Sequence, residues 1–155
     1  MDQKLQPLFT PWKIGNCEIK NRIVLTSMGG TDLFGWMEIN HFDKAGAKFI
    51  VSPGLSKEVA KVCKKKNIPY YPGIVTPTEI MEALSLGLTV LKFFPSNCFG
   101  GLKTMKALSS AFPKVKFIPT GGVDSSNIEE YLAWDKIFAV GGSAFVKESL
   151  EKCQK

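Results

Sequence analysis

Arginine and histidine are scarce in this sequence, and their scarcity bears on what the protein can bind. Arg22 is the one arginine and His41 the one histidine. The net charge is +6, but the lysines are scattered, and arginine is the side chain that dominates contacts with bases and phosphates, so we expect no nucleic-acid partner. The densest basic run, Lys64-Lys65-Lys66, is typical of a solvated helix face, although a basic surface still attracts anionic substrates.

Paired cysteines and long apolar runs are also missing. The four cysteines show no CxxC pair and no regular spacing: Cys17, Cys63, Cys98 and Cys153. We therefore expect free thiols, with no zinc site and no disulfide framework. The opening residues, MDQKLQPLF, lack the apolar core of a signal peptide, and no later run approaches a membrane span. These absences predict a cytoplasmic protein with no membrane partner, and no motif calls for a cofactor.

A strand–turn–helix unit does repeat along the chain from Ala45 onward. The strands are expected at residues 49–51, 69–71, 89–94, 115–118 and 137–140. The helices are expected at residues 56–65, 78–86 with Thr78 as the cap, 101–109, 126–133, and from 147. The unit recurs about every 20–26 residues, the length of one βα unit in a parallel sheet or barrel.

Residues 1–44 differ in character from the repeat. Residues 12–14 and 17–20, on either side of Gly15-Asn16, predict a β-hairpin. Residues 23–26 predict a buried strand, and the weakly amphipathic pattern from 31 to 44 can supply a helix near its end. The predicted fold is a single α/β domain over residues 1–155. It is TIM-barrel-like but incomplete, with about six strands where a closed barrel uses eight.

An incomplete barrel leaves an exposed strand edge and an apolar interior. The front hairpin could fill the gap, another copy of the chain could cover it, or the strands could form a rearranged α/β sheet. Of these we favour self-association, and therefore predict a homo-oligomer.

Lys92 lies in the middle of the apolar strand TVLKFF, which Gly87 precedes and Pro95 ends. A charge is costly there, so the pKa of the amine should fall toward neutrality. A neutral amine attacks carbonyls and forms Schiff bases. The alternative is a lysine that packs its stem and extends its ammonium into water, which for an arbitrary lysine of this kind is the commoner outcome.

Glycine-rich turns end the last two predicted strands. Gly121-Gly122 follows one of them and Gly141-Gly142-Ser143 follows the other. In a (β/α)₈ barrel, backbone N–H groups at this position commonly hold a phosphate. A tight turn also needs glycine, so one such turn is weak support; two in succession favour a phosphate site.

Five strand-end motifs occur in order: AGAKFIVSPG, YPGI, LKFFP, FIPTGG and VGGS. Together they resemble the C-terminal part of bacterial 2-keto-3-deoxy-6-phosphogluconate / 4-hydroxy-2-oxoglutarate aldolases, over residues 45–147. In that family the lysine of the KFFP strand forms the Schiff base with the keto acid, which implies Lys92 here. The resemblance also implies substrate or phosphate contacts at Thr31, Pro53, Phe94, Thr120, Gly121, Gly122, Gly142 and Ser143.

The front of the chain departs from that family. We find no counterpart of the glutamate general base and phosphate-binding arginine that the aldolases carry on an LEVTLRT-like strand. Residues 8–25 instead resemble the opening of flavin-dependent old yellow enzyme barrels, as in a natural or constructed chimera. The turn Met28-Gly29-Gly30-Thr31 resembles the end of that flavin-side strand and also the aldolases' glycine-alanine-glycine-threonine turn, which would put Thr31 in the site.

A flavin function is not expected, because the working histidine or asparagine pair and tyrosine of old yellow enzymes are missing. His41 is interpreted as an ordinary helix or loop residue. A yellow colour in the purified protein would reveal a flavin after all.

The resemblance implies a class I aldolase-type lyase that cleaves a 2-keto-3-deoxy-6-phospho sugar acid or 4-hydroxy-2-oxoglutarate to pyruvate and an aldehyde. Phe93, Phe94 and the prolines would keep the Lys92 amine dry. Glu79 and Glu82 are proton-shuttle candidates by residue type only, and we expect both on a helix surface, with activity weak or lost. The alternative is a catalytically inactive barrel fragment or chimera that binds phosphate or assembles with itself.

Overall fold

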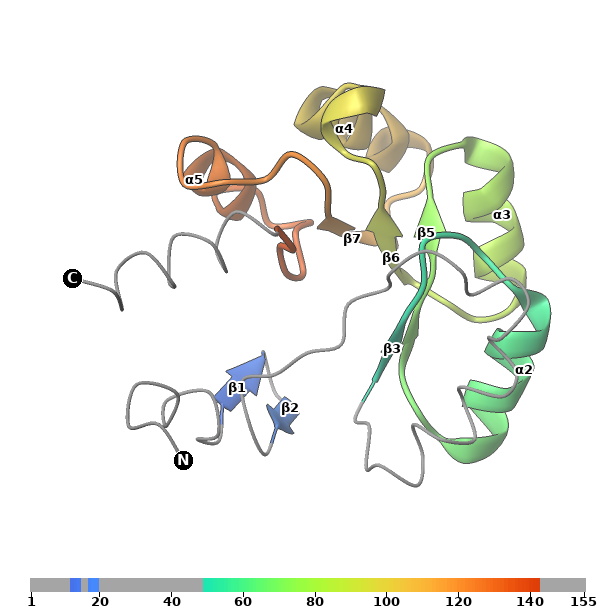
Figure 1. Ribbon diagram of the computed structural model, residues 1–155. Coiled ribbons are helices and arrows are strands. Elements are labelled where there is room, and N and C mark those ends of the chain that lie inside the picture. Colours follow the sequence, from blue (N-terminus) through green and yellow to red (C-terminus); the bar gives the residue numbers. More distant parts are fainter. Residues whose placement is uncertain (1–11, 15–16, 20–48, 143–155) are drawn as a thin grey trace, which may run out of the picture.

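Strand β6 (Val90–Phe93) is the middle strand of a three-stranded parallel sheet. It lies between β5 (Gly73–Ile74) and β7 (Lys116–Pro119), and both neighbours run parallel to it. The computed structural model describes residues 12–14, 17–19 and 49–142, and the helices of this part lie along the outer side of the strands (Figure 1). The strand predicted around Lys92 is therefore confirmed as the central one.

Further strands extend this sheet on both sides. Strand β3 (Ile50–Val51) pairs in parallel with β4 (Tyr70–Tyr71). Only Pro72 separates β4 from β5, and its carbonyl accepts the N–H of Lys92 at 2.8 Å, so β4 and β5 occupy one strand position. Beyond β7, two isolated parallel bridges join Phe117 to Ile137 and Thr120 to Gly141.

The order of the strand positions thus follows the order of the chain, as in a (β/α) barrel. The predicted strands at 49–51, 69–71, 89–94 and 115–118 are confirmed, and the one at 137–140 is present as the two bridges. The described residues have a parallel, TIM-barrel-like α/β fold and form no closed barrel among themselves.

The predicted helices between these strands are present, with small shifts at their ends. They are α2 (Lys57–Lys66), α3 (Pro77–Ser85), α4 (Gly101–Ala111) and α5 (Ile128–Leu132). A short 3₁₀ helix, η2 (Asn97–Phe99), precedes α4 and was not predicted. Within the part of the chain that the structure describes, none of the helices is long and apolar enough to cross a membrane.

The cap predicted for α3 at Thr78 is wrong, because the helix begins at Pro77 and its N-cap lies two residues earlier, at Thr76. Thr76 is the N-cap: its Oγ1 accepts the N–H of Glu79 at 3.3 Å, and Glu79 Oε2 accepts the N–H of Thr76 at 2.8 Å. This reciprocal pair needs a glutamate three residues after the cap, which only Thr76 has. Pro77 then takes the first helical position, where its missing N–H costs nothing.

The face of the sheet that packs on the helices holds the main core. Leu91 and Phe93 of β6 are fully buried there, and the ring of Phe93 meets that of Phe117 edge-on at 6.4 Å. A smaller cluster packs under α2: Ile50, Ala60, Cys63 and Tyr70. Because side chains alternate along a strand, Val90 and Lys92 project from the opposite face.

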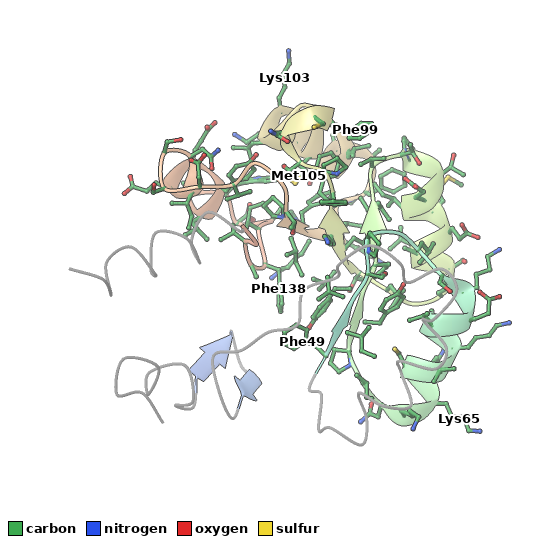
Figure 2. The ribbon with its side chains drawn as sticks, viewed as in Figure 1. Phe49, Lys65, Phe99, Lys103, Met105 and Phe138 are labelled. Atoms are coloured by element: carbon green, nitrogen blue, oxygen red, sulfur yellow. The ribbon has the colours of Figure 1, made fainter. Side chains whose placement is uncertain are left out.

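That opposite face is strongly concave. The ring of Tyr71 lies 5.9 Å from the ring of Phe49 and 5.8 Å from that of Phe138. Tyr71 and Phe138 belong to strand positions three apart, which a flat sheet would separate by roughly 14 Å. The sheet must therefore curl until these rings meet (Figure 2 labels Phe49 and Phe138). We call Phe49, Tyr71 and Phe138 the aromatic row.

The predicted N-terminal hairpin is also confirmed. Strand β1 (Trp12–Ile14) pairs antiparallel with β2 (Cys17–Ile19). The strand predicted at 23–26, the segment 31–44 and the helix from 147 lie outside the described residues, as do Thr31 and Ser143. The total of six strands and the self-association remain predictions.

The capping box of α3 gives a stability prediction. Thr76→Ala removes the oxygen that accepts the Glu79 N–H, and we expect it to lower the free energy of unfolding by about 1 kcal/mol. Thr78→Ala is the matched control, since Thr78 is an exposed residue inside the same first turn. Urea denaturation of both variants measures the difference, and an equal loss in the two would contradict the assignment of the cap.

Candidate active site

Lys92 is buried, with only 4% of its surface exposed. Its strand neighbours in register are Gly73 on β5 and Ile118 on β7, neither of which carries a charge. Burial lowers the pKa of the Lys92 amine below its usual 10.5, because the charged form loses hydration. The sequence prediction of a buried lysine with a lowered pKa is confirmed, and the alternative of an ammonium extended into water is not supported.

Gly73 is required beside Lys92 by a close approach of two backbones. A Cβ atom at this position would overlap the backbone carbonyl of Pro53. Only glycine lets the turn after β3 pack directly on the strand that pairs with Lys92. The structure therefore brings Pro53, a predicted site residue, against the strand neighbour of the lysine.

Phe94 covers the Lys92 amine. Lys92 Nζ lies 4.3 Å from the centroid of the Phe94 ring, a distance at which the ring face attracts a cation. Phe93 does not do this: its side chain is fully buried in the core on the helix side of the sheet. The expectation that both phenylalanines shield the amine is thus wrong for Phe93, because adjacent residues of a strand point to opposite faces.

The turn after β7 packs against the chain that follows β6. Gly121 and Gly122 have φ angles of +89° and +78°, a region that glycine adopts without strain. A Cβ at Gly121 would lie 3.2 Å from Pro95 Cα, and one at Gly122 would overlap the side chain of Asn97. Gly121 in turn accepts the N–H of Asn97 at 3.1 Å. Both positions therefore require glycine, for its positive φ angle and for its lack of a Cβ atom.

Most of the predicted site residues gather at the carboxyl ends of the strands. Thr120 donates its N–H to Phe93 O at 3.0 Å and bridges to Gly141, which precedes Gly142. The residues brought to this end of the sheet are Pro53, Lys92, Phe94, Thr120, Gly121, Gly122 and Gly142. This edge is where parallel α/β proteins build their sites.

Ser96 and Tyr131 tie this end of the sheet together, and the sequence analysis missed both. Ser96 is fully buried; its N–H donates to Thr120 O at 2.8 Å and its carbonyl accepts the N–H of Gly101 at 2.8 Å. Its hydroxyl lies 3.2 Å from the hydroxyl of Tyr131 on α5. The pair thus links the ends of β6 and β7 to α4 and α5. The two residues are 35 positions apart, and no sequence motif connects them.

The two candidate proton shuttles on α3 are occupied elsewhere. Burial opposes ionisation of Glu79, but hydrogen bonds from the Val75 N–H and from the Thr76 N–H and hydroxyl outweigh it and lower the pKa of Glu79. Glu82 pairs with Lys57 at 2.6 Å on the surface. The expectation that both lie on a helix surface is confirmed, and neither is available as a shuttle in this arrangement.

Cys63 and Cys98, the two cysteines among residues 49–142, are free thiols. Cys63 is buried under α2, and burial raises its pKa to about 11, whereas Cys98 is exposed. Among residues 49–142, three or more histidine, cysteine or acidic side chains do not come together in a group that could hold a metal ion.

The described residues thus place a buried lysine on a central strand of a TIM-barrel-like fold, with glycine turns at the carboxyl ends of the parallel βα units. The chain belongs to the KDPG and KHG aldolase family, whose family model matches residues 18–155. This match begins earlier than the resemblance over residues 45–147, so residues 18–44 also fall within the family. The resemblance of residues 8–25 to flavin barrels stays a prediction.

Curated relatives agree with this assignment. The chain is 42% identical over 106 residues to the 2-dehydro-3-deoxy-phosphogluconate aldolase of Haemophilus influenzae, covering 68% of this chain and 50% of the relative. It is 36% identical over 119 residues to the KHG/KDPG aldolase of Escherichia coli K12, covering 77% of this chain and 56% of the relative. The chain therefore spans about half the length of the curated relatives it matches.

Solved structures show the same fold. One is KDPG aldolase from Legionella pneumophila, with pyruvate captured as a covalent carbinolamine intermediate. It superposes with a TM-score of 0.69 at 42% identity, covering 76% of this chain and 56% of that one. The 4-hydroxy-2-oxoglutarate aldolase/2-deydro-3-deoxyphosphogluconate aldolase from TTHB1 gives a TM-score of 0.70 at 42% identity, covering 76% and 60%.

The Ser96–Tyr131 contact gives a prediction that separates a hydrogen bond from simple packing. Tyr131→Phe leaves the buried Ser96 hydroxyl unsatisfied, and we expect a loss of about 1–3 kcal/mol in the free energy of unfolding. The double variant Ser96→Ala/Tyr131→Phe should lose less than the sum of the single losses, because neither group is then left unpaired. Urea titrations of the four proteins measure the coupling; additive losses would contradict a direct bond.

Burial of Lys92 predicts a dependence of stability on pH. Its pKa is lower in the folded than in the unfolded protein, so between the folded value and 10.5 the unfolded chain binds the extra proton. The burial penalty is therefore complete at low pH and disappears as the pH rises toward 10.5. Lys92→Met should have a higher free energy of unfolding than the parent at pH 7. This difference should become smaller as the pH rises to 10.

Chemical denaturation across this pH range checks the trend, with the exposed Lys103→Met as control. For each variant, the difference in the free energy of unfolding from the parent is followed with pH. If this difference narrows no more for Lys92→Met than for Lys103→Met, Lys92 is not desolvated.

Proposed function

We propose that this protein is a class I aldolase that cleaves a 2-keto-3-deoxy-6-phospho sugar acid or 4-hydroxy-2-oxoglutarate to pyruvate and an aldehyde, with Lys92 as the nucleophile. The observation that carries the proposal is the burial of Lys92, with a lowered amine pKa, on the KFFP strand of a member of the KDPG and KHG aldolase family. A lysine with this environment has a larger neutral fraction near neutral pH.

In this mechanism the neutral amine of Lys92 adds to the C2 carbonyl of the keto acid. Loss of water from the carbinolamine gives an iminium ion. Removal of the C4 hydroxyl proton then lets the C3–C4 bond break: its electron pair moves into the iminium to give an enamine, and the aldehyde leaves. Protonation of the enamine at C3 and hydrolysis release pyruvate and restore the amine.

The residues around Lys92 take supporting roles in the proposal. The ring of Phe94, 4.3 Å from Nζ, shields the amine and gives the substrate an apolar contact. Pro53, Thr31 and Thr120 contact the keto-acid end. The backbone N–H groups of Gly121, Gly122, Gly142 and Ser143 bind the phosphate or the second carboxylate, as glycine turns at strand ends do elsewhere.

Proton transfer is the weak step of this mechanism. Glu79 and Glu82 are engaged at the α3 cap and with Lys57, so they supply no base to the C4 hydroxyl. We therefore propose that carbinolamine and iminium formation are retained while C–C cleavage is slow. A positioned general base typically contributes 10²–10⁴-fold, which bounds the expected loss.

A second candidate function is that of a catalytically inactive barrel fragment or chimera. It is kept because the strands of the described residues form no closed barrel among themselves. In that case residues 1–155 form a single cytoplasmic domain that binds phosphate or assembles into a homo-oligomer, and the lysine is a remnant of an aldolase ancestor.

Trapping with pyruvate and borohydride separates the two functions. We expect the intact protein to gain the mass of one reduced pyruvate adduct at millimolar pyruvate, and the adduct to map to Lys92. Lys92→Ala should lose the adduct, whereas Lys103→Ala, a change at an exposed lysine of α4, should keep it. Mass spectrometry of the whole protein and of its peptides is the readout. An unlabelled parent would favour the inactive fragment.

A further inference from the structure

The aromatic row lies on the same concave face of the sheet as Lys92. Tyr71 lies two residues before Gly73, the register partner of Lys92, so the two strands present Tyr71 and Lys92 on the same face. Phe138 donates its N–H to Phe117 O at 2.8 Å, which places it beside Ile118, the other partner of Lys92. The row therefore reaches both strand positions that flank the lysine.

Aromatic side chains therefore lie on this face on either side of Lys92 along the strands. Phe94, whose ring lies 4.3 Å from Nζ, follows the lysine toward the carboxyl ends, and Tyr71 lies two residues before its register partner, toward the amino ends. The contact of Tyr71 with Phe138 also spans strand positions that a flat sheet would hold far apart. Loss of that contact would relax the curl of the sheet and open the floor beneath the amine to water.

We propose that the aromatic row is a positioning device for the nucleophile: Phe138, held against Tyr71, closes the concave face beneath Lys92 and keeps water from its amine. The inference rests on the proposed role of Lys92 as the Schiff-base lysine. It assigns to Phe49, Tyr71 and Phe138 a function that the resemblance to the aldolases does not imply for them.

Few titratable groups share this face among the described residues. They are the Tyr71 phenol in the row and the exposed ammonium of Lys116, which lies in register with Val90 at the start of β7. Strand β5 contributes none. Lys136, just before the bridge to β7, donates its ammonium to Pro113 O at 2.7 Å and so points away. The test therefore changes Phe138, which carries no charge, and leaves these groups in place.

Competitive acetylation of the full chain measures the titration of Lys92 without any substrate. The protein is labelled with limiting acetic anhydride between pH 6 and pH 11, and the Lys92 peptide is quantified by mass spectrometry. We expect Phe138→Ala to raise the midpoint of labelling by about one pH unit, since full burial displaces a lysine pKa by roughly 3–5 units. Phe138→Tyr keeps the ring and should restore the parent midpoint.

Met81→Ala is the matched control, because Met81 is an apolar side chain with 63% exposure on α3, compared with 42% for Phe138. If Phe138→Ala fails to fold by circular dichroism, Phe138→Leu takes its place with a smaller upward shift expected. Equal midpoints in all folded variants, or no labelling of Lys92 in any of them, would overturn the proposal. The readout uses no pyruvate, so failure of the aldolase function leaves it interpretable.

Discussion

The desolvation of Lys92 is the constraint on which the rest of this structure depends. A lysine on the central strand of a sheet is tolerated only where its neighbours provide space and keep water out. Gly73 lets the Pro53 carbonyl approach where any Cβ would collide, so the turn after β3 packs against the strand partner of Lys92. Phe94 covers the amine. The surrounding backbone thus holds a lysine at a buried position that would ordinarily carry an apolar side chain.

The hydrogen-bonded framework around the site fixes the relative position of its two halves. Ser96 connects the strand that carries Lys92 to the turn that carries Gly121 and Gly122, through Thr120 O on one side and Tyr131 on the other. Both partners are buried, so these bonds are exposed to little competition from water. Lys92 and the glycine turn after β7 therefore remain in one geometry, although they belong to different βα units.

The sequence predicts local features well where a single residue type dictates the outcome. The apolar run around Lys92 predicts the central strand, and the Gly-Gly pair after β7 predicts a turn that only positive φ angles can make. It fails where two residues compete for one role, as with Thr76 and Thr78 at the start of α3. It also fails where partners are far apart in the chain: Ser96 with Tyr131, and Tyr71 with Phe138, meet only because the sheet curls.

That curl has a physical cause. A parallel sheet with one apolar concave face must cover it, and in a closed barrel the interior side chains of all strands share that task. Among the described residues, aromatic rings from the first, second and last strand positions meet across the hollow. Large rings span more of the interior than aliphatic side chains and lose little conformational entropy in doing so. Aromatic residues thus cover part of the concave face on which Lys92 lies, among the strands that the structure describes.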